Sequence, residues 1–292
     1  MRCVFFKYLV PAACLSCTPA CGEGPDSIVL SGESQTAASS LSTLVMSLTY
    51  EDGSEDSGNP DVGANIPSTY RRDIVTDLKR RGRYSVRHKL KISDPEDPVA
   101  GSMRSESHNE AMLNARITPG QIRYYGFSIY FPTTWETDAG SDDIVFQWKG
   151  FGGPPFMFIT QKHDDIVLRF NYDSNVNPSQ GTIVKQSAVL APLTKGKWHD
   201  FRFRVVWEYR DNGVGRINVD HKLHTESSYT RVLNYAGPTM FNRDGYLKWG
   251  IYKPSWDKAI VGGYAGSVEV RNIWHDNVRV GSTWEEVDPA DY

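Results

Sequence analysis

The chain has 292 residues, of which 39% are hydrophobic and 23% are charged, as in an ordinary soluble globular protein. The formal net charge is −3, which argues against a protein that binds nucleic acid through a broadly basic surface. All four cysteines lie within the first 21 residues. The rest of the chain can therefore hold no disulfide framework, no cysteine-ligated zinc, no iron–sulfur cluster and no cysteine nucleophile.

The first 21 residues are typical of an export signal. Arg2 and Lys7 supply positive charge, a mostly apolar run follows, and small residues precede Cys21. The apolar run is shorter than the ~20 residues that a membrane span needs. Pro19-Ala20-Cys21 also resembles a bacterial lipoprotein cleavage site. We expect residues 1–21 to be the signal peptide of a secreted or outer-envelope protein, with a lipidated cysteine as its only membrane attachment.

Residues 22–65 are rich in Ser, Gly, Thr, Asp and Glu, and residues 51–61 contain no apolar side chain. Such a segment buries too little apolar surface to fold alone, so the composition predicts a flexible linker over residues 22–65. The globular domain is then expected over residues 66–292.

From residue 70 onward, short alternating stretches recur between clusters of Gly, Pro, Asn and Asp. This pattern predicts β-strands, and helical periodicity is scarce. In chain order the predicted strands are 84–92, 102–109, 123–131, 143–149, 156–160, 165–171, 182–190, 198–209, 215–221, 245–252 and 265–280. Asn212-Gly213 separates two of them and predicts a hairpin turn. Around ten strands in one domain predict an all-β fold, a β-jelly-roll sandwich of two antiparallel sheets.

Three of these strands place polar side chains on one face, since residues two apart in a strand point the same way. The polar positions are Arg104, Glu106 and His108 in the first strand, Gln147 and Lys149 in the second, and Tyr246, Lys248 and Tyr252 in the third. The alternate positions are apolar, and we expect Ile144, Phe146, Trp148, Leu247, Trp249 and Ile251 to face the core. If the three strands are neighbours, their polar sides form a cationic surface suited to an anionic sugar chain.

The motifs RSE at 104–106, QWK at 147–149 and YLKWGIYK at 246–253 resemble those of jelly-roll polysaccharide lyases. These belong to the heparin lyase I-like and glucuronan lyase group (polysaccharide lyase family 20), related to the alginate lyase superfamily. The resemblance covers about residues 70–285. It implies a concanavalin-like sandwich and a monomer that cleaves a 1,4-linked acidic polysaccharide by β-elimination. That reaction leaves 4,5-unsaturated uronate ends and requires no cofactor.

The resemblance also implies roles for the polar residues. β-Elimination removes the proton on C5, so the site must neutralise the adjacent carboxylate. Gln147, Arg104 and a protonated His108 are expected to do so as hydrogen-bond donors. Tyr252 is the expected base and acid, with Lys248 and Arg104 lowering its pKa. Substrate binding is expected from Lys149, Glu106 and Tyr246, and Glu106 can alternatively orient the cations through ion pairs.

Lys149 departs from the pattern of the alginate lyases, which usually have histidine at this position. An ammonium group can neutralise charge but is a weaker proton shuttle than imidazole unless its pKa is lowered. His108 is the nearest alternative shuttle. The sequence therefore favours a single tyrosine acting on one side of the ring, and hence glucuronan as substrate. An alginate lyase of the same fold and a non-catalytic carbohydrate-binding module remain the alternatives.

Two further features have weaker functional readings. Asp276 and Asn277 offer oxygen ligands, and some relatives bind structural calcium, so both are candidates for such a site. Residues 70–91 contain nine lysines and arginines against two aspartates, and this stretch is either a solvated strand and turn or a rim that steers a polyanion. A glycoside hydrolase needs two suitably spaced carboxylates, and the three polar strand faces supply only Glu106.

Overall fold

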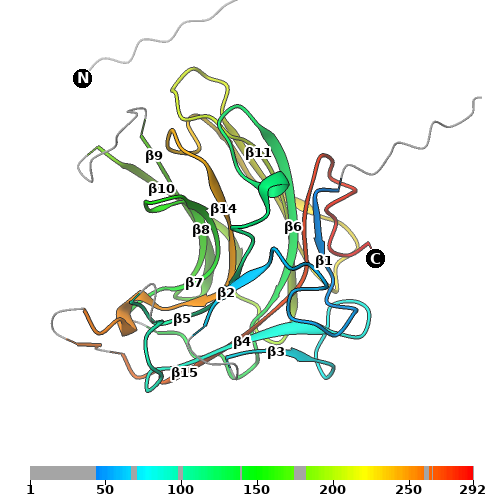
Figure 1. The fold of residues 1–292 in the computed structure, drawn as a ribbon, viewed down its shortest axis with the longest axis vertical. Coiled ribbons are helices and arrows are strands. Elements are labelled where there is room, and N and C mark those ends of the chain that lie inside the picture. Colours follow the sequence, from blue (N-terminus) through cyan, green and yellow to red (C-terminus); the bar gives the residue numbers. More distant parts are fainter. Residues whose placement is uncertain are drawn as a thin grey trace, which may run out of the picture. The chain divides into compact units, whose positions relative to one another are not determined.

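The computed structural model describes residues 44–66, 71–97, 101–138, 140–173, 182–259, 263–264 and 266–291. The predicted signal peptide, residues 22–43 of the predicted linker and the last residue lie outside the described residues. Within the described part, the strands form two antiparallel sheets that pack face to face (Figure 1). The all-β sandwich predicted from the strand pattern is confirmed.

One sheet has seven strands, in the order β10-β9-β8-β7-β14-β5-β2. Their bounds are β2 Gly63–Asn65, β5 Arg104–His108, β7 Asp143–Gly150, β8 Pro155–Lys162, β9 Asp165–Tyr172, β10 Val184–Pro192 and β14 Gly245–Tyr252. This sheet is curved, and its concave face points away from the other sheet (Figure 1). The three strands with polar faces, β5, β14 and β7, are therefore direct neighbours near its centre.

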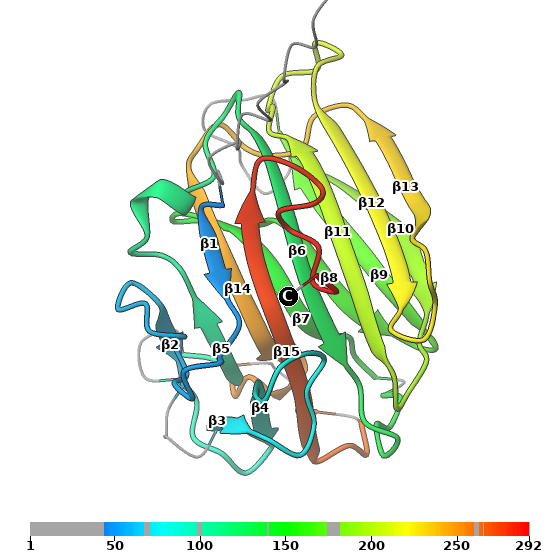
Figure 2. The same ribbon diagram turned by 90° about the vertical axis from the view of Figure 1, so that its right-hand side faces the viewer.

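The other sheet has eight strands, in the order β13-β12-β11-β6-β15-β4-β3, with β1 also paired to β15. Their bounds are β1 Met46–Leu48, β3 Arg72–Val75, β4 Ser85–Lys91, β6 Ile122–Tyr130, β11 Trp198–Val206, β12 Arg216–Leu223, β13 Thr230–Ala236 and β15 Val270–Gly281. Figure 2 shows this sheet face-on, with β15 beside β6. Two short 3₁₀ helices, η2 (Leu113–Ala115) and η3 (Pro254–Trp256), lie in connecting segments. No helix among the described residues is long and apolar enough to cross a membrane.

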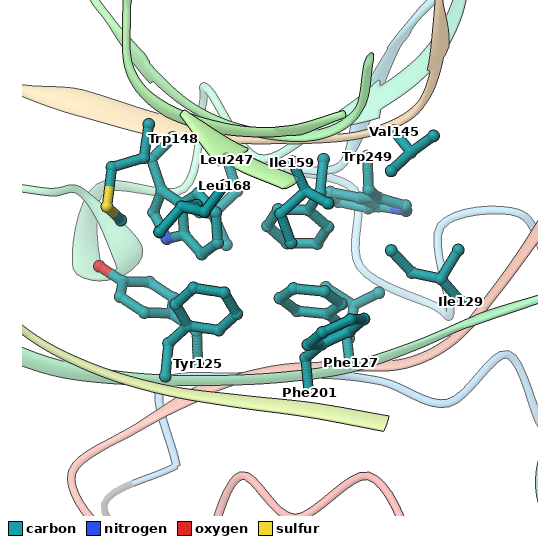
Figure 3. Close-up of a cluster of buried hydrophobic side chains, with 14 of the residues drawn as sticks. Tyr125, Phe127, Ile129, Val145, Trp148, Ile159, Leu168, Phe201, Leu247 and Trp249 are labelled. Atoms are coloured by element: carbon teal, nitrogen blue, oxygen red, sulfur yellow. The ribbon is translucent and has the colours of Figure 1, made fainter. Parts of the chain in front are cut away.

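The space between the sheets is filled largely by aromatic side chains (Figure 3). Phe127 of β6 stacks on Phe146 of β7 with ring centroids 3.9 Å apart, and Trp148 packs against Phe203 of β11 at 4.8 Å. Each such side chain contributes about 1.5–3 kcal/mol when it is taken fully out of water. This apolar layer fixes which face of β7 points outward, so the core determines the orientation of the polar residues.

Each of the eleven predicted strands overlaps a strand of the structure. The predicted hairpin is also present, since β11 and β12 are paired and Gly213 has the positive φ of +74° that such a turn requires. The prediction missed β1, β2, β3 and β13. The first three have three or four residues, which is too short to show a period.

The prediction of a linker is wrong for residues 44–65, which belong to the domain. β1 pairs with β15, and β2 pairs with β5 at the edge of the seven-stranded sheet. Tyr50 is fully buried and accepts a hydrogen bond of 3.0 Å from Trp249 Nε1. The acidic stretch forms hydrogen-bonded turns in which Ser54 Oγ donates to Asp56 and accepts from Gly58 N. Polar composition predicted flexibility here, whereas the local hydrogen bonds satisfy the backbone.

We predict that a protein starting at residue 67 is much less stable than one starting at residue 42. The shorter chain loses β1, β2 and four buried apolar side chains, Met46, Leu48, Tyr50 and Val62. At about 1.5–3 kcal/mol per buried side chain, the loss approaches the 5–15 kcal/mol of a whole domain. Thermal unfolding followed by circular dichroism checks this. Equal midpoints for the two chains would show that residues 44–65 add nothing to the domain.

Candidate active site

The register of β5, β14 and β7 brings the predicted site residues together on the concave face. Lys248 of β14 lies between His108 of β5 and Gln147 of β7. Further along β14, Tyr252 lies opposite Arg104. In the other direction, Tyr246 is opposite Lys149. The eight residues predicted from three separate sequence motifs thus form one continuous surface, which the sequence alone could not show.

The Glu106 carboxylate is the centre of this surface. One oxygen accepts a short hydrogen bond from Gln147 Nε2. The other lies 3.0 Å from Arg104 Nη1 and 3.4 Å from Lys248 Nζ. Glu106 is buried, so these contacts compensate for removing its charge from water. Each of the three strands contributes at least one side chain to the cluster, and Glu106 orients the cations as the ion-pair reading expected.

Lys248 is held by a second partner that the sequence did not suggest. Its Nζ lies 2.5 Å from the Asn65 side-chain oxygen in β2. Asn65 falls inside the segment predicted to be a linker, so no strand pattern pointed to it. With one carboxylate and one amide oxygen as partners, the Lys248 ammonium is fixed in place rather than free to move a proton.

Tyr252 has an environment that differs from the expectation. Its hydroxyl donates a 3.0 Å hydrogen bond to Asp257 Oδ2, and the Arg104 guanidinium stacks on its ring at 4.2 Å. Burial and the Asp257 carboxylate raise the pKa of Tyr252 to about 12, and the opposing effect of Arg104 is smaller. Arg104 thus acts in the predicted direction, but the predicted net lowering of the Tyr252 pKa is wrong. Tyr252 is therefore a neutral phenol whose hydroxyl is hydrogen-bonded to a proton acceptor, the Asp257 carboxylate.

Lys149 is the cation of the cluster that has no acidic partner. Among the described residues, no carboxylate lies within ion-pair distance of its Nζ. Burial lowers the pKa of Lys149 to about 8, and the nearby charges of Lys248, Arg104 and Arg243 act in the same direction. The Lys149 ammonium therefore lacks a compensating charge, and a bound anion would favour its protonated form.

His108 is unsuited to the role of a protonated donor. Burial lowers its pKa below the ordinary value of 6.5, and the neighbouring Lys248 lowers it further. The ring is therefore neutral at pH 7. The ring lies edge-on to Tyr246 with ring centroids 6.2 Å apart. The backbone of Gly63 in β2 packs closely against the His108 ring. His108 lies on β5 beside Lys248, and Tyr246 lies two residues before Lys248 on β14, so the two rings form one edge of the polar surface.

A cavity of about 480 Å³ opens on the concave face beside this cluster. Gln147 and Tyr252 line it together with Ile144, Phe158 and Arg169. Ile144 was expected in the core, but a bulge between Ile144 and Phe146 shifts the register, and Val145 packs in the core instead. The cavity therefore combines an apolar floor with amide, phenol and guanidinium groups, as sugar-binding sites do.

The comparisons with known proteins identify the family of the chain. The polysaccharide lyase family model matches residues 49–279, which is most of the chain. The chain belongs to the polysaccharide lyase family. No curated protein matches the sequence.

Solved structures show the same fold as this lyase. An endo-β-1,4-glucuronan lyase from the fungus Trichoderma reesei superposes with a TM-score of 0.62 at 20% identity, covering 79% of this chain and 94% of that one. A family PL-14 alginate lyase from Aplysia kurodai gives 0.53 at 12%, covering 82% and 100%. The catalytic domain of a glycoside hydrolase family 131 protein from Coprinopsis cinerea gives 0.55 at 12%, covering 84% and 97%. The sandwich is therefore shared by lyases and a hydrolase.

Asp257 is the main site residue of the lyase that sequence reasoning missed. It lies just after η3, and its Oδ1 accepts a 2.6 Å hydrogen bond from Met103 N while Oδ2 holds Tyr252. Burial raises the pKa of Asp257 above its ordinary value. A loop residue has no strand period that would place it on a face. The only available signal was its position, five residues after Tyr252.

The calcium candidates lie in β15, on the other sheet. Asp276 Oδ2 accepts hydrogen bonds from Arg80 N and Arg81 N, and Oδ1 accepts one from Asn277 N. Both oxygens are thus used by backbone donors, and burial raises the pKa of Asp276 to about 7. Nowhere in the described ranges do three His, Cys, Asp or Glu side chains gather as metal ligands. The Asp276 carboxylate is thus already satisfied by backbone donors, and the calcium site stays a prediction.

The basic stretch at 70–91 also lies away from the concave face, in β3, β4 and the turn between them. Arg71 pairs with Asp94, Arg80 with Asp200, and Arg87 with Asp73. Because these cations already have internal partners, the arrangement favours a structural role over a steering rim.

We predict that Glu106→Gln destabilises the lyase by about 3 kcal/mol, because it leaves Arg104 and Lys248 buried without their shared anion. Chemical denaturation measures the change in the free energy of unfolding. Glu136→Gln is the matched control, since Glu136 is exposed and such surface changes stay within about 0.5 kcal/mol. Equal effects of the two substitutions would contradict the central role given to Glu106.

Proposed function

We propose that this lyase cleaves a 1,4-linked uronate polysaccharide by β-elimination, with glucuronan as the favoured substrate. The observation that carries the proposal is the set of donors around Glu106 beside Tyr252: Arg104, Gln147 and Lys149 on one concave face. Such a set recognises a carboxylate next to an acidic C–H bond. The leader-like residues 1–21 support a secreted or envelope-attached enzyme that meets this polymer outside the cell.

The first requirement is neutralisation of the substrate carboxylate. Gln147 uses one of its two N–H donors on Glu106 and keeps the other. Arg104 donates through Nε to Ser102 and through Nη1 to Glu106, so Nη2 remains for the ligand. Lys149 adds a positive charge that no carboxylate of the described residues pairs with. These groups are already oriented, so they stabilise the enolate-like charge that develops at the carboxylate without reorganising.

Proton transfer is assigned to Tyr252 and Asp257 acting together. As Tyr252 Oη takes the proton from C5, its own phenolic proton passes along the 3.0 Å hydrogen bond to Asp257 Oδ2. The electron pair of the C5–H bond forms the C4–C5 double bond, and the bond from C4 to O4 breaks. Tyr252 then gives a proton to O4 and recovers one from Asp257. The phenol stays neutral, as its raised pKa requires.

One tyrosine serves both steps only if H5 and O4 lie on the same side of the sugar ring. Glucuronate and mannuronate meet this condition, whereas guluronate and iduronate need a second group on the opposite side. The structural likeness to a glucuronan lyase supports glucuronate among the first two. Mannuronate-rich alginate is the second candidate, supported by the shared fold of an alginate lyase.

We predict that the lyase releases products with the ultraviolet absorbance of a conjugated double bond from glucuronan, and less from alginate, hyaluronan and heparin. Tyr252→Phe and Asp257→Asn should each lower kcat by about 100- to 10,000-fold, the usual contribution of general acid–base catalysis. Tyr84→Phe, the same change just before β4 on the other sheet, is the control. New reducing ends without the absorbance would indicate a hydrolase, and binding without either would indicate a carbohydrate-binding module.

The pH dependence separates the two roles open to Lys149. If its charge neutralises the substrate carboxylate, kcat/KM falls as the pH rises through about 8, where Lys149 loses its proton. If Lys149 were instead the base, kcat/KM would rise through the same pH. We predict the fall. Lys149→Arg stays charged and should remove this limb, and a rising limb in the wild type would overturn the assignment of Tyr252 as base.

A further inference from the structure

A second cavity continues the concave face beyond the proposed reaction centre. It measures about 510 Å³ and is lined by the β7–β8 hairpin at Gly152, Gly153 and Pro154, by Asn171 of β9, and by Lys185 and Arg243. Pro154, Asn171 and Lys185 also line the cavity that contains Gln147 and Tyr252. The two cavities therefore form one groove, and we name the second part, around Lys185 and Arg243, the distal cavity.

Both titratable residues that line the distal cavity are positively charged. Lys185 and Arg243 contribute cations, and the lining includes no carboxylate. Lys185 is exposed on β10 and has no ion-pair partner within the described ranges. A groove wall that gathers cations without balancing anions attracts an anionic ligand and disfavours a neutral one.

Arg243 is built into this wall by its backbone contacts. Its Nη1 donates to the carbonyl oxygens of Phe151 at 3.3 Å and Gly152 at 3.1 Å. Glycine at 153 makes room for the guanidinium, since a Cβ there would lie 2.3 Å from Nη1. These contacts use Nη1 and leave the donors on Nη2 and Nε for a ligand, and the planar guanidinium binds a carboxylate with two parallel hydrogen bonds.

The sheet register gives the separation of the distal cavity from the reaction centre. A row of paired residues crosses the strands from Gln147 through Phe158 and Arg169 to Ser187. Lys185 lies on the same strand as Ser187, two residues away, and opposite Asn171. At ~4.8 Å per strand, three strand spacings place Lys185 roughly 15 Å from Gln147. That distance spans about three 1,4-linked sugar rings.

We propose that Lys185 and Arg243 form a distal subsite for the carboxylate of a further uronate unit, with Lys185 about three sugars from Gln147. The inference rests on the proposed uronate lyase function and extends it to the length of the substrate. Between the two ends, Phe158 provides an apolar surface and Arg169, which pairs with Asp142, flanks it. An enzyme with this subsite gains binding energy from chains long enough to fill the groove.

The test compares a uronate hexasaccharide with a trisaccharide of the polymer that the wild-type protein cleaves, using the full chain. The ratio of kcat/KM for hexasaccharide over trisaccharide is the readout. We expect Lys185→Gln and Arg243→Gln each to lower this ratio by about tenfold, the size of one lost charge-assisted contact, and the double variant to lower it further. Lys195→Gln, an exposed lysine in the turn after β10, should leave the ratio unchanged.

The outcomes separate the two proposals. If the wild type cleaves no uronate polymer, the proposed function fails. If it cleaves the polymer but shows no preference for the hexasaccharide, or if the Lys185→Gln and double variants keep the wild-type ratio, the distal subsite is wrong and the lyase function stands. Thermal unfolding of each variant checks the fold. If Arg243→Gln is unstable, Lys185→Gln decides, because Lys185 is exposed and has no ion-pair partner in the described ranges.

Discussion

The site depends on one buried carboxylate, Glu106, which holds donors from three strands at a single point. Cations from neighbouring strands repel one another, and their clustering is tolerable only with an anion among them. Gly250, opposite Glu106 on β14, makes this possible. Its φ of +140° is accessible to glycine, and a Cβ there would lie 2.2 Å from the Ser105 carbonyl oxygen. The close approach of β5 to β14 is thus encoded by the glycine within the YLKWGIYK motif.

Glu106 balances only part of the positive charge, and the remainder prepares the surface for an anion. Lys149 has neighbouring cations but no ion-pair partner in the described part of the chain, and burial together with those cations lowers its pKa. A bound uronate carboxylate would remove that cost and raise the pKa again. By linkage, ligand binding near pH 8 therefore takes up protons, and affinity weakens as Lys149 deprotonates. Under the proposed function, Lys149 therefore couples recognition of the substrate to its activation.

The sequence predicted the fold and the positions of the site well where a regular period was present. Alternation in β5, β7 and β14 placed Arg104, Gln147 and Tyr252 on one face, and the motif resemblance supplied their adjacency. The sequence-based prediction failed where the chain has no regular period. A bulge exchanged Ile144 and Val145, short strands hid residues 44–65, and Asp257 lies in a loop. The predicted direction of the Tyr252 pKa was also wrong, because burial and the loop residue Asp257 together raise it.

The fold alone does not decide between elimination and hydrolysis, because a glycoside hydrolase and lyases share this sandwich. The side chains on the concave face do distinguish them. A retaining or inverting hydrolase needs two carboxyl groups facing the scissile bond across a fixed gap. Here both oxygens of Glu106 accept contacts from Arg104, Gln147 and Lys248. Asp257 accepts hydrogen bonds from the Tyr252 hydroxyl and the Met103 amide. In this arrangement Glu106 orients donors, and Asp257 is placed to act on a substrate only through Tyr252. These placements favour the proposed β-elimination, whose first step removes a proton made acidic by those donors, over hydrolysis.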